Sequence, residues 1–295
     1  MSDTIITYAI PFFLLLILAE VIYSNLHDLD LYHGKDTFAS LVMGLGSVLI
    51  SIGVKFIAFA GFSFLYQFAL FDIGYQWWAW LILIFADDFT FYVHHRASHS
   101  VRLLWAAHVN HHSSKRMNLG TALRQSWTEL FYKYVWWIWL PLLGFPPIMV
   151  LTMISINLIY QFWIHTETIG KLGPIEWLFN TPSHHRVHHA TNIKYLDRNH
   201  AGMFIIWDRL FGTFVEEDEN EQPDYGIRGP HPTYNPFHIA THAFIDLWRD
   251  IRQPNPLWVK LRYIFMPPGW SPDGSTLTTN QLREGVNKGL ISADA

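Results

Sequence analysis

Long apolar runs occupy much of the first 165 residues and limit what this chain can fold into. The first extends from Ile5 to Tyr23 and the second from Thr37 to Phe71. A helix that crosses a bilayer needs about 20 apolar residues, because each residue adds about 1.5 Å to its length. Charged residues make up only 15% of the chain, against about 25% in soluble domains. The sequence therefore predicts a helical integral membrane protein.

Three more apolar runs follow. Residues 77–93 begin with three tryptophans within four positions, which suit the belt at a membrane–water interface. The runs 132–143 and 148–164 flank the turn 144–147, where two prolines stop the helix, so we expect a transmembrane hairpin. The run 37–71 is long and interrupted by glycines, which predicts one span plus an interfacial or re-entrant piece. The first run lacks the basic residues and cleavage site of a signal peptide, which predicts a retained helix.

Basic residues indicate the orientation. Lys and Arg gather after the third and fifth runs, whereas the turns 72–76 and 144–147 contain none. Positive charge favours the cytoplasmic side, so we expect both histidine-rich segments there. The expected parts are transmembrane helices over 1–93, two cytosolic histidine boxes over 94–130, a transmembrane hairpin over 131–165, a third box with cytosolic or interfacial helices over 166–266, and a flexible C-terminal tail over 267–295.

The histidines form three clusters with helical spacing, the first box at 95–99, the second at 108–112 and the third at 185–189. Residues three and four apart lie on one face of a helix, so each cluster can present two or three imidazoles to one side. Another histidine ends the fifth run. The sequence lacks cysteine, so a metal would be held by His, Asp or Glu. Nine imidazoles are too many for one ion and predict two metals, held by His95, His99, His108, His111, His112, His165, His185, His188 and His189.

Other residues could support these ligands. His184 adjoins the third cluster outside the repeated spacing, and is a possible additional ligand. Asp88 and Tyr92 lie on the same helical face as the first box, and Gln161 lies one turn before the histidine that ends the fifth run. Metal-bound imidazoles commonly donate their second N–H to a carboxylate, which makes Asp88 and Asp208 candidate partners.

Several functions are disfavoured by the sequence. The net charge of −4 provides no basic field for nucleic acid, and the motifs of phosphate-binding loops, serine hydrolases and zinc proteases are absent from it. A metal transporter or sensor is an alternative, but transporters usually place their ligands near the bilayer midplane. A zinc hydrolase needs three ligands and an open position, which nine histidines match poorly.

These motifs resemble the fatty acid hydroxylase/sterol desaturase superfamily over roughly 87–214. The resemblance rests on the spacing of Asp88, Tyr92, His95 and His99, on the two H-x-x-H-H boxes, and on the string WDRLFGTF at 207–214. Longer strings at 111–114, 118–126, 160–167 and 180–189 resemble its ether-lipid branch. His200 stands where that family usually has tyrosine, and could replace an aromatic wall residue or add a ligand.

The resemblance implies an all-α membrane fold with a cytosolic helical cap, where a di-iron centre held by the nine histidines activates O2 beside a lipid. For the ether-lipid branch it implies tetrahydrobiopterin as reductant and cleavage of the alkylglycerol ether bond after hydroxylation. A fatty-acid or sterol hydroxylase or desaturase fed by a redox partner protein remains an alternative. Residues 239–251 predict an amphipathic helix on the membrane surface. Candidates for the lipid channel are Phe162, Trp163, Trp207 and Phe211.

Overall fold

The computed structural model describes residues 2–229 and 234–292, and they fold into helices joined by loops. Within those ranges, β-structure is limited to isolated bridges such as Phe179 with Phe204. The all-helical architecture expected from the sequence is therefore confirmed for the described residues. The α-helices are α1 (Ser2–Leu26), α2 (Gly34–Tyr66), α3 (Trp77–Ser100), α4 (Arg102–His112), α5 (Trp139–Leu143), α6 (Pro147–Trp163), α7 (Pro182–His189), α8 (Ile206–Phe211), α9 (Pro236–Arg252), α10 (Leu257–Phe265) and α11 (Thr279–Asn287).

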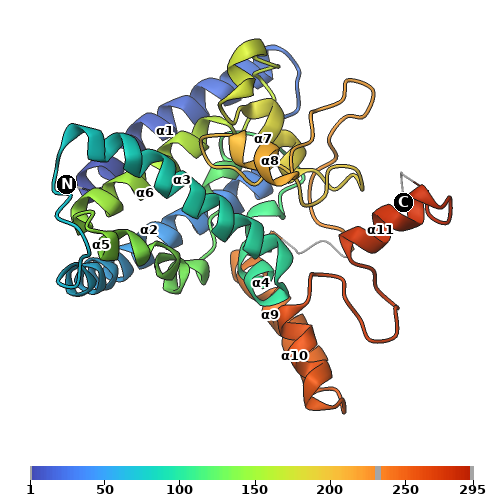
Figure 1. Ribbon diagram of the computed structural model, residues 1–295. Coiled ribbons are helices and arrows are strands. Elements are labelled where there is room, and N and C mark those ends of the chain that lie inside the picture. The colour runs from blue at the N-terminus through green and yellow to red at the C-terminus, as the bar shows by residue number, and fades with distance from the viewer. Residues whose placement is uncertain (1, 230–233, 293–295) are drawn as a thin grey trace.

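Two helices of the described chain are long and apolar enough to cross a membrane. They are α1, over Tyr8–Leu26, and α2, over Gly34–Tyr66. The apolar helix α6 is shorter, with 17 residues. In Figure 1, α1, α3 and α6 form one bundle with α2 beside it, and α9 and α10 project from the bundle next to α4.

Helix α2 is continuous, which differs from the expected span with a separate re-entrant piece. Its glycines provide close packing instead of a break. A Cβ atom on Gly46 would lie 2.6 Å from the indole nitrogen of Trp127, and one on Gly44 would lie 2.9 Å from the carbonyl oxygen of Leu123. The glycines therefore let the loop after α4 lie directly against the helix, because a side chain would not fit.

The first arm of the expected transmembrane hairpin, residues 132–143, also differs from a continuous α-helix. Residues Lys133–Trp137 form a 3-10 helix, and only the five residues of α5 continue it as an α-helix. Gly144 ends α5 with a φ of +114°, in the left-handed region that favours glycine. Pro147 then occupies the first turn of α6, where proline is tolerated because the N–H that it lacks would have no acceptor within the helix.

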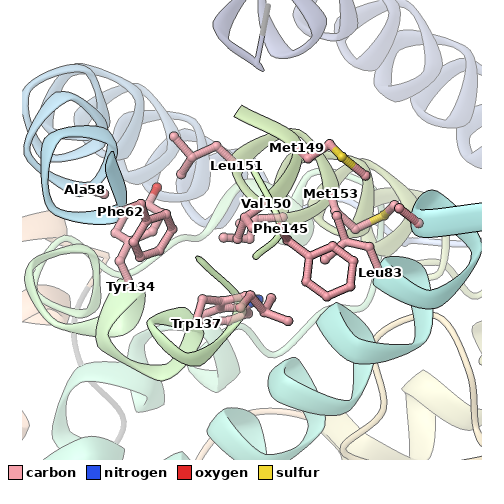
Figure 2. Close-up of a cluster of buried hydrophobic side chains, with 13 residues drawn as sticks. Ala58, Phe62, Leu83, Tyr134, Trp137, Phe145, Met149, Val150, Leu151 and Met153 are labelled. Atoms are coloured by element: carbon pink, nitrogen blue, oxygen red, sulfur yellow. The ribbon is translucent and has the colours of Figure 1, made fainter. Parts of the chain in front are cut away.

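A hydrophobic core joins four elements behind the histidines. It contains Phe62 of α2, Leu83 of α3, Trp137 of the 3-10 helix and Met149 of α6, all buried. Figure 2 shows these side chains within one cluster, with Val150 and Phe145 between Phe62 and Leu83. The indole of Trp137 also donates a hydrogen bond to the buried carboxylate of Asp87, at 2.7 Å. This core fixes α3 against α6, and both helices deliver ligands at their C-terminal ends.

The C-terminal segment has more structure than the expected flexible tail. It contains α11, whose first turn is closed by Thr278 and Gln281, each bonding to the other's backbone. The predicted amphipathic helix over 239–251 is confirmed as α9.

Candidate metal centre

Nine buried histidines form two adjacent groups, and none of them is more than 9% exposed. Within each group the ligand nitrogens lie within 4.8 Å of one another. The first group consists of His95, His99, His108, His112 and His188, and the second of His111, His165, His185 and His189. These are the nine residues that the sequence predicts as ligands, and the structure brings all of them together.

Helical geometry explains how one box serves both groups. Positions four apart lie within about 40° of each other around the helix, whereas the position three ahead points about 60° to the other side. Helix α4 therefore gives His108 and His112 to the first group and His111 to the second. Helix α7 does the reverse, giving the pair His185 and His189 to the second group and His188 to the first.

The ring nitrogens are spaced as metal ligands are. Nε2 of His95 lies 3.0 Å from Nε2 of His108, and Nε2 of His165 lies 2.9 Å from that of His185. Two imidazole nitrogens that bind one ion at about 2.1 Å and at right angles lie about 3.0 Å apart. In addition, the buried Nε2 atoms of His99, His112 and His188 have no hydrogen-bond partner among the described residues. The donor set therefore fits two metal ions.

The opposite nitrogens hold several rings in place. Nδ1 of His95 bonds to the carbonyl oxygen of His200 at 2.8 Å, and Nδ1 of His188 bonds to that of Arg198 at 2.9 Å. A carbonyl can only accept, so Nδ1 carries the proton and Nε2 keeps its lone pair for a metal. The main-chain oxygens of Gln161 and Arg124 hold His165 and His111 in the same way.

Two carboxylates hold ligand rings and were not identified from the sequence. Nδ1 of His108 lies 3.1 Å from Glu129, and Nδ1 of His99 lies 3.1 Å from Asp197. One signal could have found the first, because Glu129 is the only acidic residue between Asp88 and Glu167. Asp197 has a φ of +49°, a property that the sequence does not reveal.

Burial disfavours the charged form of most of these imidazoles. With the neighbouring rings, it lowers the pKa of His95 and His188 well below the usual value. Burial alone would raise the pKa of Glu129, but the hydrogen bond to His108 and the charges nearby bring it below its usual range. The centre thus places mostly uncharged imidazoles beside an ionised carboxylate, which suits a cation.

The two acids expected to support the ligands, Asp88 and Asp208, act on them through other residues. Asp88 accepts hydrogen bonds from the backbone N–H groups of Met203 and Phe204, at 2.6 and 2.9 Å, and from the indole of Trp207. Its predicted contact with a ligand ring is therefore wrong, because its oxygens are used by the turn before α8. Asp208 accepts from the backbone N–H groups of His200 and Ala201, both at 2.8 Å. It thereby fixes the carbonyl that holds His95.

Of the two other expected supporting residues, Tyr92 and Gln161, only Gln161 bonds to a ligand ring. The hydroxyl of Tyr92 pairs with Thr213 at 2.9 Å and receives a hydrogen bond from Arg96. Gln161 supports His165 through its main-chain oxygen, while its side chain donates to Asn157. Their role is to tie the helices together around the centre.

His184 and His200 lie outside both groups. The ring of His184 meets Phe214 edge-on, with centroids 5.3 Å apart. The ring of His200 is closer to the ligands, with its centroid 4.9 Å from that of His99. His200 therefore forms part of the wall of the first group.

The four predicted channel residues are packed against protein. Phe162 stacks on Phe13 with centroids 3.9 Å apart, Phe211 stacks on Tyr92 at 5.5 Å, and Trp163 meets Tyr160 edge-on. Trp207 is the donor to Asp88 described above. None of these four lines the large cavity beside the histidines.

That cavity has a volume of about 720 Å³ and adjoins the first group. One wall is formed by the ligands His99, His112, His188 and His189. The rest of the lining includes Trp105 of α4 and, from the C-terminal part of the chain, Asp246 and Asp250 of α9, Tyr263 of α10, and Trp270. The cavity leads directly to the nitrogens that would hold a metal.

Comparison with known proteins agrees with this geometry. Residues 80–213 match the family model described as Fatty acid hydroxylase, and this segment contains all nine histidines. The chain is 38% identical over 272 residues to alkylglycerol monooxygenase of Homo sapiens, and 37% identical over 271 residues to that of Danio rerio. Each alignment covers 90% of this chain, which spans 59% and 60% of those two relatives.

A more distant relative is the ornithine lipid hydroxylase OlsE of Rhizobium tropici, 30% identical over 143 residues, or 48% of this chain and 43% of that protein. No solved structure matches the chain. The segment that matches the family model extends from within α3 to just beyond α8 and contains the histidine boxes. Residues 80–213 of this chain therefore form a fatty acid hydroxylase domain.

Proposed function

We propose that this protein is a membrane-bound di-iron monooxygenase that uses O2 to hydroxylate a lipid and cleaves the ether bond of alkylglycerols. The observation that carries the proposal is the pair of adjacent, buried histidine groups, with five and four nitrogens. Imidazole suits iron as well as zinc and copper, so the family supports the choice of iron. The substrate class follows the name of relatives that align over 90% of this chain.

The nine histidines would hold two irons, whose chemistry when bound is the activation of O2 for insertion into a C–H bond. The protein itself orients the ligand rings and shields the centre. Carbonyl and carboxylate partners at Nδ1 fix the rings of His95, His99 and His108 before the metals bind. The burial of the ligand rings limits the access of water to the centre, which protects a reactive oxidant from side reactions.

Hydroxylation beside an ether oxygen explains the cleavage. One oxygen atom of O2 enters the lipid at the carbon next to the ether oxygen, and the other leaves as water after two electrons and two protons are supplied. The product is a hemiacetal, which breaks into an aldehyde and free glycerol. We infer tetrahydrobiopterin as the source of the electrons, by analogy with the ether-lipid branch. A protein redox partner is the alternative donor.

The proposed membrane arrangement follows the basic residues of the sequence. The segments that carry the histidine boxes lie in the cytoplasm, and α1 and α2 cross the bilayer. Segments 77–93 and 131–165 are proposed as further membrane-embedded parts. The lipid would then reach the centre from the cytoplasmic leaflet.

The test compares two lipids that differ at one position. Purified protein loaded with iron is incubated with O2, tetrahydrobiopterin and either an alkylglycerol or the acylglycerol of the same chain length. The acylglycerol has a carbonyl where the alkylglycerol has its reactive C–H bonds. We expect aldehyde and O2 consumption with the alkylglycerol alone.

Other outcomes separate the alternatives. Turnover of a fatty acid or sterol that requires a redox protein would contradict the ether-lipid assignment. It would favour a fatty-acid or sterol hydroxylase or desaturase instead. O2 consumption with no lipid at all, or two bound metals that exchange freely across a membrane, would contradict the monooxygenase proposal.

A further inference from the structure

The helices α9 and α10 form a hairpin with an apolar surface that the rest of the described chain leaves uncovered. In α10, Leu257, Leu261 and Phe265 follow one another at intervals of four residues and are 72%, 45% and 62% exposed. Trp258 extends the same face. The opposite face carries Val259, which is buried. Residues four apart share a side of a helix, so the exposed residues form one stripe.

Helix α9 has two apolar faces. Ile239 and Ala240 are buried against Ala39 and Met43 of α2. Phe237, Ile245 and Trp248 are exposed and spaced by eight and three residues, which again places them on one side. A helix that needed only to cover the protein core would require just the first face. The second face needs an apolar partner outside the described fold.

The position of the hairpin indicates that partner. Ala39 and Met43 belong to the first turns of α2, one of the two candidate membrane spans. Helix α9 therefore lies at the level where that span begins. Figure 1 shows α9 and α10 beside α4, away from the N-terminal ends of α1 and α3. A bilayer crossed by α2 would have its surface at this level.

Charged residues around the stripe fit the same surroundings. Arg249 and Arg252 stand in the last turn of α9, and Lys260 and Arg262 stand in α10 on either side of Leu261. Helices that lie in a membrane interface combine an apolar face with flanking Lys and Arg, and tryptophan is favoured at that depth. Trp248 and Trp258 occupy such positions, at 60% and 56% exposure.

The hairpin is fixed to the helix that carries the second histidine box. Arg102 at the start of α4 forms an ion pair with Asp250 of α9, and its backbone N–H donates to the carbonyl of Met266 at 3.1 Å. Asp250 and Tyr263 also line the cavity beside the ligands. The hairpin thus forms one wall of the space that leads to the proposed metals.

We propose that the α9–α10 hairpin lies in the headgroup layer of the bilayer, with its exposed apolar stripe toward the acyl chains. It thereby holds the cavity of about 720 Å³ at the level of the lipid headgroups, so that a lipid reaches the ligands without leaving the membrane surface. The proposed position of the hairpin does not depend on the proposed function. The proposed path of the lipid does rest on that function.

Depth measurements test the position directly. The sequence contains no cysteine, so a spin label can be attached at a single introduced cysteine in protein reconstituted into lipid nanodiscs. The variants are Leu261→Cys and Phe265→Cys on the stripe, with Glu284→Cys on exposed α11 as the matched control. Power saturation then compares collisions with O2, which concentrates in lipid, and with a water-soluble nickel complex.

We expect the two stripe labels to be accessible to O2 and shielded from nickel, and the control label to show the reverse. Stripe labels as accessible to nickel as the control would overturn the proposal. So would dipolar broadening between labels on separate chains, because it would show that a second copy covers the stripe. Neither result depends on activity, so failure here is distinct from failure of the proposed function.

The lipid path has its own readout. In Leu261→Asp, we expect KM for an alkylglycerol in vesicles to rise at least tenfold, while kcat for a short-chain, water-soluble alkylglycerol stays unchanged. An equal KM in vesicles for the variant and the native protein would contradict the path. Loss of turnover with the soluble substrate as well would contradict it too, since the effect would then lie in the centre.

Discussion

Nδ1 of His108 lies 3.1 Å from a carboxylate oxygen of Glu129, which connects the second histidine box to a short 3-10 helix 21 residues further along the chain. Partners of this kind fix the orientation of a ligand ring and increase its affinity for a metal. We expect Glu129→Ala to weaken metal binding by about 10- to 100-fold. Glu129→Gln, which keeps an oxygen acceptor, should retain most of it. Metal titration of both variants gives the comparison, and equal affinities for them would contradict this positioning role.

The division of the histidines into two groups predicts which substitutions remove a metal. His188→Ala takes a ligand from the first group, and His185→Ala takes one from the second. Each should lower the metal content or affinity of one site and abolish turnover. His184→Gln and His200→Gln change rings outside both groups and should keep two metals per chain. Metal analysis of the purified variants checks this, and loss of a metal in His184→Gln would show that the grouping is wrong.

The contact between α2 and the loop after α4 predicts opposite effects for two glycines in one helix. Alanine at Gly46 would place Cβ 2.6 Å from the indole nitrogen of Trp127, and overpacking of this kind costs about 1–3 kcal/mol. Alanine at Gly53 would meet nothing within 4 Å and should be neutral or stabilising by up to about 1 kcal/mol, since alanine favours helices. Thermal unfolding in detergent measures both, and a Gly46→Ala variant as stable as Gly53→Ala would contradict the close contact.

The proposed orientation can be tested in intact cells. We expect a cysteine at Tyr75, in the turn between α2 and α3, to react with a membrane-impermeant maleimide. A cysteine at Glu219, in the acidic loop after α8, should react only after the cells are opened. Both positions are exposed in the structure, so access depends on the side of the membrane. The reverse pattern would place the histidine boxes outside the cytoplasm.

The sequence predicts well which histidines come together, because their spacing follows helical geometry. His108, His111 and His112 show their i, i+3 and i+4 relation in the sequence alone. What it cannot show is that α4 and α7 divide their rings between the two groups in opposite ways, because this depends on how the helices are rotated against each other. The carboxylate of Asp197 was missed for the same reason, since it meets His99 only through the turn of the folded chain.

The remaining differences also come from tertiary contacts. Glycines in the run 37–71 suggested an interruption, but packing against Trp127 and Leu123 uses them inside a continuous helix. Asp88 has the spacing of a ligand partner, yet the backbone of Met203 and Phe204 takes up its oxygens. In both cases the local pattern identifies a residue with a special role, and contacts distant in sequence decide which role it has.

The central claim is a two-iron centre held by nine histidines. Metal analysis combined with Mössbauer spectroscopy, on protein purified from iron-replete cells, tests it most directly. The two groups predict two irons per chain, magnetically coupled because the sites adjoin. A single iron, or zinc that iron cannot replace, would contradict the claim.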